Sequence, residues 1–230
     1  MFKFKKSSIV IIYIIVLNEG DYMKDIYNIY RKELSKNNIL YFIVLIVFFV
    51  GLIVGSFYIT FLNNSDKKYV LDSVSNFFNL KYSFSEQIKI FKKSLIDNNI
   101  YFIIMWLLGI SGIGIIFIYL MVFFKAFTLG FSLAGIFAKY KFNGFIISII
   151  YLFPSHLIIC FLTILLSTYS LNISINLLIN AFKKKQLNFN NFMGKYLYIL
   201  FLLILFSFIC SLIDGFVTPY FIKIFTKFIK

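Results

Sequence analysis

Long apolar runs separated by short polar stretches dominate the chain. Residues 39–61, 100–124 and 192–213 form three such runs, and each is long enough to cross a bilayer, because a spanning helix needs about 20 mostly apolar residues. A further apolar stretch covers 126–182. The pattern therefore predicts an all-α integral membrane protein, a polytopic bundle of about five transmembrane helices.

The stretch over 126–182 is interrupted twice. The polar sequence KYKFNG at 139–144 divides it into a short span over 126–138 and a long span over 145–182, and Pro154 lies inside the long one. Two interpretations of the long part remain open: one tilted, kinked helix, or a re-entrant half-helix before Pro154 followed by a full span. Irregular backbone is tolerated at membrane depth only where protein or water shields it.

The polar segment 63–99 lies between the first two spans. Its second half opens with Ser83-x-x-Glu86, which is the pattern of a helix capping box, and apolar residues recur at helical spacing in both halves. We predict an external loop of two amphipathic helices. The outward residues of the second helix should include Lys92 and Ser94.

The first residues resemble a signal sequence, with a charged start and an apolar run. That run is too short to span a membrane, and no small-residue cleavage site follows it. We expect translation to start at Met23 rather than Met1, with 1–22 as a leader or mis-assigned start; a weak surface anchor there is the alternative. Residues 23–38 then form an amphipathic cytoplasmic helix, and 39–230 form the polytopic membrane domain.

The composition agrees with a membrane protein. Of 230 residues, 61% are hydrophobic and 14% charged, whereas soluble domains are roughly half apolar and about a quarter charged. The net charge of +14 would suit nucleic acid, but the lysines lie at the ends of apolar runs and in loops, where they face anionic lipid and set orientation. We expect the lipid bilayer as a partner and no nucleic acid.

The lysines also predict an orientation. Basic residues before the first span, Lys125 after the second and Lys183 to Lys185 before the last all fit the cytoplasm. With five crossings, as expected above, the N-terminus is cytoplasmic, the C-terminus is external and the loop 63–99 faces outside.

Small residues recur four positions apart in two spans. This spacing lets two helices approach closely in lipid. We favour packing within the bundle over a seam between two copies in a homo-oligomer. The residues are Gly51, Gly55, Ala126, Gly130, Ala134 and Ala138.

A polar stripe follows the fourth span. Thr168, Asn172, Asn176 and Asn180 share one helix face, and unpaired amides are costly in hydrocarbon, so this face should look inward. Contacts within the bundle are the favoured interpretation, and a transport path is the alternative.

His156 follows Pro154 and Ser155. Proline removes a backbone donor and frees a carbonyl one turn earlier, and Ser155 or His156 can satisfy the freed groups. We prefer this structural interpretation to a proton relay, because no carboxylate lies near His156 in the sequence.

The chain lacks the motifs of catalysis. It has no phosphate-binding glycine loop, no metal-ligand cluster and no nucleophile with a base close in sequence. Cys160 and Cys210 both lie in apolar runs, which suits neither a disulfide nor a metal site. We expect a protein that is not an enzyme and that binds no metal or cofactor.

Five motifs follow one another along the chain: FFVGLIVGS from Phe48, NNIYFIIMWLLGISGIG from Asn98, FKAFTLGF from Phe124, FNGFIISIIYLFPSHLI from Phe142 and IDGFVTP from Ile213. Their order and spacing resemble the stage II sporulation protein M family. The likeness runs from Met23 to Pro219.

The family ends its last span with an acid, an aromatic residue and Thr-Pro, and Asp214, Phe216, Thr218 and Pro219 occupy those places. We expect the acid at the membrane edge to cap or pair with a neighbouring segment. The proline should stop the helix and turn the chain along the surface.

The resemblance implies a membrane scaffold at the sporulation septum of an endospore-forming bacterium. Such a protein anchors two external peptidoglycan hydrolases, the stage II sporulation proteins D and P, during engulfment of the forespore. Lys92 and Lys93 on the external loop are the candidate partner surface. The alternative function is a permease-like subunit that works with a separate ATPase, which the short third span and the asparagine stripe would suit.

Overall fold

The computed structural model describes residues 38–79, 83–151, 155–183 and 189–221. The chain divides into two compact units, 1–39 and 40–230, and only the second is described below. The expectations for 1–22 and for nearly all of 23–38 lie outside the described residues, as does Pro154.

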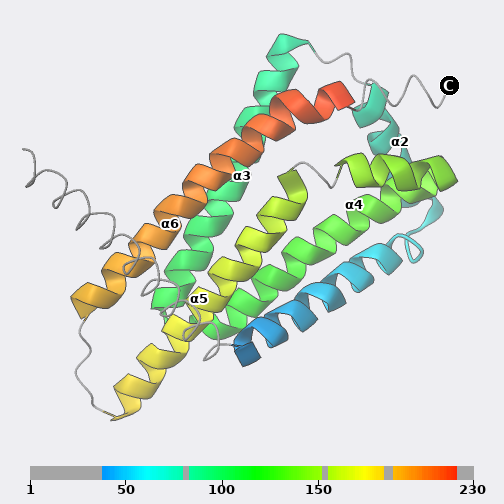
Figure 1. Cartoon of the computed structure of the whole chain (residues 1–230). Coiled ribbons are helices and arrows are strands. Elements are labelled where there is room, and N and C mark those ends of the chain that lie inside the picture. Colours follow the sequence, from blue (N-terminus) through cyan, green and yellow to red (C-terminus); the bar gives the residue numbers. More distant parts are fainter. Residues whose placement is uncertain (1–37, 80–82, 152–154, 184–188, 222–230) are drawn as a thin grey trace, which may run out of the picture. The chain divides into compact units, whose positions relative to one another are not determined.

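The described residues form helices and no strand (Figure 1). The first span is the helix Asn38–Tyr58. The elements after it are α2 (Asn64–Asn79), α3 (Phe84–Ile110), α4 (Gly114–Tyr151), α5 (Leu157–Lys183), α6 (Phe189–Leu212) and the π-helix η2 (Ile213–Val217).

Four helices in the described part are long and apolar enough to cross a membrane. They are Asn38–Tyr58, Gly114–Ile146, Leu157–Phe182 and Tyr196–Phe221. The prediction of an all-helical, multi-pass membrane protein is therefore confirmed. The count of five spans is not, because α3 is not among these helices.

The predicted span over 100–124 is wrong. The Ser83–Glu86 capping box is present, but the helix that it opens continues without a break from the polar segment to Ile110. The chain then turns through Ser111, whose extended backbone ends α3, and the amide of Gly114 donates to the Ser111 carbonyl at 3.0 Å. Glycines at this turn allow the close approach, since a Cβ on Gly112 would press on Leu178 of α5.

The expected short span over 126–138 is part of a longer helix. The break at KYKFNG exists as a kink at Lys141, whose φ of 51° and ψ of −127° interrupt α4. The helix before this kink begins at Gly114, however, and the candidate span that starts there continues past the kink to Ile146. Beyond the kink α4 ends at Tyr151 and α5 begins at Leu157. The long predicted span is therefore two helical pieces.

The central helix of the bundle is α5. Of its span window 61% is buried, against 22%, 33% and 28% for the other three. It contacts α3, α4 and α6 (Figure 1). Its buried face carries small hydroxyl residues that bond across helices: Ser170 pairs with the Tyr196 hydroxyl at 2.8 Å, and Ser174 donates to the Ser111 carbonyl at 2.6 Å.

The first span packs on α4 through glycines. A Cβ added to Gly51 would lie 2.5 Å from the Phe123 carbonyl oxygen, and one on Gly55 would meet the Phe127 carbonyl. In return, a Cβ on Gly130 would meet the Leu52 carbonyl. Backbone thus touches backbone in both directions, which is the geometry that small residues permit in lipid.

We predict that Gly51→Leu and Gly130→Leu each lower the free energy of unfolding in detergent by about 1–3 kcal/mol, because the added side chain must separate two backbones. Thermal and denaturant unfolding measure the loss. Gly194→Leu is the control, since nothing lies within 4 Å of a Cβ there. Equal losses for all three variants would refute close glycine packing.

Candidate functional site

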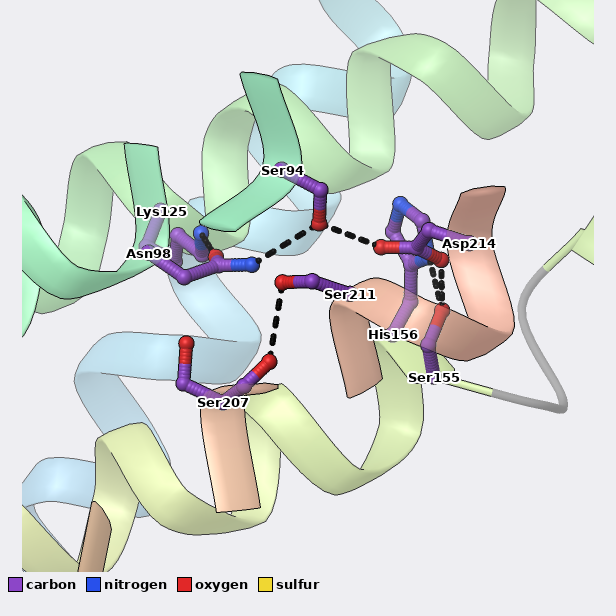
Figure 2. A network of polar contacts seen from close by, with 8 residues as sticks. All are labelled: Ser94, Asn98, Lys125, Ser155, His156, Ser207, Ser211 and Asp214. Carbon is purple, nitrogen blue, oxygen red and sulfur yellow. Dashed lines mark hydrogen bonds and ion pairs between the residues drawn. The ribbon is translucent and has the colours of Figure 1, made fainter. Parts of the chain in front are cut away.

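Polar side chains from four separate segments meet inside the bundle (Figure 2). Ser94 and Asn98 come from α3 and Lys125 from α4. Ser155 and His156 immediately precede α5, and Asp214 lies in η2. We call the six residues named here the polar network.

The hydrogen bonds of the network connect its cation to its anion. Lys125 Nζ donates to Asn98 Oδ1 at 3.1 Å, Asn98 Nδ2 donates to Ser94 Oγ at 3.2 Å, and Ser94 Oγ donates to Asp214 Oδ2 at 2.6 Å. All three hydrogen bonds run in the same direction, from the Lys125 ammonium to the Asp214 carboxylate. Bonds aligned in this way polarise and strengthen one another.

Ser155 and His156 hold the other side of the carboxylate. The Ser155 hydroxyl donates to Asp214 Oδ1, and His156 Nδ1 lies 3.8 Å from the same oxygen. Ser155 Oγ is also 3.2 Å from His156 Nδ1. A hydroxyl has one hydrogen to donate, so the histidine is the donor in this last contact and carries its proton on Nδ1.

These three residues are not a catalytic triad. In a triad the histidine takes the proton of the serine, and the carboxylate contacts only the histidine. Here the serine donates to the carboxylate directly, and its side chain is fully buried. Burial lowers the pKa of His156 below its usual value, Asp214 acts against this shift, and Lys125 reinforces it.

A widened turn places Asp214 in the network. Proline in a regular helix clashes with the carbonyl four residues earlier, and here that residue, Gly215, lies in the π-helix that ends directly before Thr218. Gly215 packs tightly on α3, where a Cβ would lie 2.7 Å from Phe91 Cβ. The chain stays helical through Pro219. The expectation that this proline stops the helix is therefore wrong.

A cavity of about 430 Å³ lies beside the network. Network residues Ser94, Asn98, Lys125, His156 and Asp214 line it. Its other lining residues are Phe77, Ile90, Lys93, Asp97, Leu129, Ile159, Cys160 and Thr218. Among the residues that the structure describes, no group of three or more His, Cys, Asp or Glu side chains is placed to hold a metal ion.

Three sequence interpretations fail at this site. Lys125 does not lie in a cytoplasmic loop, because it is inside α4 and bonded to Asn98. Ser94 does not point outward, because it donates to Asp214. A carboxylate does lie beside His156, although 58 residues separate them in the sequence. The expectation that Asp214 pairs with a neighbouring segment agrees with its bonds to Ser94 and Ser155.

The predicted polar stripe lies on α5 and is not part of the polar network. Thr168 is buried and donates to the Ile164 carbonyl of its own helix. Asn176 donates to Asn172 at 3.1 Å, while Asn180 is partly buried. These hydrogen bonds run along one helix rather than between helices. The bonds between helices start instead from Ser170 and Ser174.

The remaining predicted residues are distributed over several surfaces. Phe216 lies near the rings of Phe84 and Phe91, at 6.4 and 6.3 Å between centroids. Lys92 and Lys93 are exposed on α3. In the small-residue stripe of α4, Ala126 and Gly130 are buried, Ala134 is partly buried and Ala138 is exposed.

Sequence reasoning missed Asn98, Ser94 and Ser155 as partners of a charge. Two signals were present. Lys125 is the one charged residue between Gly114 and Ala138, and an isolated charge within a span marks a paired or functional group. Ser94 and Asn98 lie four residues apart and so share a helix face.

The family model described as stage II sporulation protein M matches residues 44–219. This range contains all six residues of the network and ends at Pro219. No curated protein matches the chain. No solved structure matches it either.

We predict that Lys125→Met and Asp214→Asn each destabilise the protein, because each leaves the opposite charge without compensation. The double variant should be more stable than the sum of the two losses predicts, with a coupling of about 1–3 kcal/mol. Thermal unfolding in detergent measures the cycle. Lys139→Met is the control, because it removes an exposed lysine of α4 and should change stability little. If the losses for Lys125→Met and Asp214→Asn simply add in the double variant, the two charges are not coupled through the network.

Proposed function

The chain belongs to the stage II sporulation protein M family, whose members are sporulation-related membrane proteins, and on this premise we propose that it is a non-enzymatic scaffold. It localises peptidoglycan-degrading partners at the septum during engulfment. By family resemblance these partners are the stage II sporulation proteins D and P.

The observation that carries this proposal is the polar network itself. Its serines, its asparagine and both its charges bond to one another, so no hydroxyl is activated as a nucleophile. The network connects α3, α4, η2 and the segment before α5. Connected polar groups of this kind fix helices in one arrangement, which is what a docking platform needs.

The platform in this proposal is formed by α2 and the first turns of α3. Lys92 and Lys93 are exposed there, and Lys68 is exposed on α2. The helices rest on the bundle: α2 contacts α4, and Phe91 packs edge-on against Phe208 of α6 at 5.7 Å between centroids. Charged residues around a few apolar anchors are a common form of protein interface.

The arrangement of the helices favours five traverses of the bundle. α3 contacts α4, α5 and α6, and its Phe102 and Met105 are fully buried. We propose that α3 crosses with the four apolar spans, and that Ser94 and Asn98 are paired in the network where the helix enters the bundle. The N-terminus is then cytoplasmic and the C-terminus external.

Cysteine labelling of intact cells tests this topology. A cysteine at Lys67 should react with an impermeant reagent, and one at Lys183 should react only after the membrane is opened. A tag at the C-terminus should be accessible from outside. Labelling of Lys183→Cys from outside would exclude the proposed orientation.

Deleting the gene should arrest engulfment in membrane-stained sporulating cells, and the wild-type gene should restore it.

We predict that a Lys92→Glu/Lys93→Glu variant inserts normally but recruits less of the external hydrolase, because both changes reverse charge on the exposed face of α3. Co-purification from detergent, scored against total protein, measures recruitment.

Lys139→Glu/Lys141→Glu is the matched control, because it makes the same charge change at two exposed lysines of another helix. Normal engulfment in the deletion strain would reject the scaffold and favour the permease-like alternative. Normal recruitment by the Lys92→Glu/Lys93→Glu variant would show that the partner does not bind this face of α3.

A further inference from the structure

The cavity beside the network contains donors that the protein leaves unused. The Lys125 ammonium has three N–H groups to donate. One goes to Asn98, and the ammonium lies 5.0 Å from the centroid of the Tyr101 ring. Thr218 lines the same cavity and is only 4% exposed, and its hydroxyl makes no hydrogen bond within the described part of the chain. A buried hydroxyl without a hydrogen-bond partner is costly. The Thr218 hydroxyl therefore indicates that a bound molecule supplies its partner.

The Asp214 carboxylate can also accept further hydrogen bonds. Asp214 accepts hydrogen bonds from Ser94 and Ser155, whereas a carboxylate offers about four acceptor sites. At the rim, Asp97 adds a second carboxylate and Lys93 a second ammonium, and both side chains are exposed. Positive and negative groups are therefore balanced around one space.

The size and walls of the cavity suit a small molecule. Ligand sites typically enclose about 300–1,000 Å³ and combine apolar walls with a few polar groups. Here Ile90, Leu129 and Ile159 supply apolar wall. A ligand of a single charge would meet a like charge at close range, which costs binding energy. A ligand with both charges would meet a partner for each.

We propose that this cavity binds a small zwitterion, a molecule that carries both an ammonium and an anionic oxygen group. Lys125 and Thr218 hold the anionic oxygen, and Asp214 and Asp97 hold the ammonium. Two sources carry this chemistry: a free dipeptide, whose two ends carry opposite charges, and the ethanolamine phosphate headgroup of a phospholipid. The proposal does not depend on the role at the septum.

Thermal unfolding of the full chain in detergent tests the proposal with dialanine, N-acetyl-dialanine and dialanine amide. Dialanine should raise Tm by about 3 °C at ten times its Kd, and the two analogues that lack one charge should not. Glycerophosphoethanolamine forms the second arm. Its control is glycerophosphocholine, whose quaternary ammonium has no N–H to donate.

A rise in Tm with dialanine alone identifies a free dipeptide as the ligand, and a rise with glycerophosphoethanolamine alone identifies a lipid headgroup. Either result, or both together, supports a zwitterion site. No rise with any compound, or equal rises with the singly charged or quaternary controls, overturns it.

Thr218→Val separates binding from folding, because it keeps the shape of the side chain and removes a hydroxyl that bonds none of the described residues. It should raise the Kd for the zwitterion that binds about three- to tenfold. Thr163→Val is the matched control: Thr163 is also fully buried with an unpaired hydroxyl, but it does not line the cavity. An unchanged Kd for Thr218→Val, or equal losses for both variants, contradicts the site.

Discussion

A lysine and an aspartate inside a lipid-embedded bundle must be compensated, because an isolated charge in a low-dielectric interior costs several kcal/mol even after relaxation. Lys125 and Asp214 meet this constraint through intermediaries: Asn98 and Ser94 carry hydrogen bonds from the ammonium to the carboxylate. Both intermediaries belong to α3. The need to compensate two charges therefore holds a helix with a polar first half among helices that are far more apolar.

The other features at this end of the bundle follow from that placement. Because Asp214 must reach Ser94, the end of the last span lies against α3, and Gly215 supplies the space that Phe91 occupies. The π-helix accommodates Pro219 and keeps the chain helical, so Thr218 is buried beside the cavity rather than exposed past a helix end. Ser155, fully buried, holds the start of α5 to the same carboxylate.

Elements with a strong local signal could be predicted from the sequence. The first span, the capping box at Ser83 and the break within KYKFNG all depend on residues that are close in the chain. Span boundaries failed at 100–124, because hydropathy does not register the turn at Ser111, which depends on glycines packing against α5. The polar network was missed because its contacts join residues up to 120 positions apart.

Two devices hold these helices together, and each supplies what the other lacks. Lipid tails are as apolar as leucine, so apolar burial gives helices in a membrane little reason to prefer one another. Glycine contacts between the first span and α4 bring backbones together, but they specify only closeness. Directional bonds add a unique arrangement: Ser170 and Tyr196 join α5 to α6, and the Tyr196 hydroxyl also donates to the Trp106 carbonyl of α3 at 2.8 Å. The scaffold function proposed above depends on such specificity, because a docking platform must hold its surfaces in fixed positions.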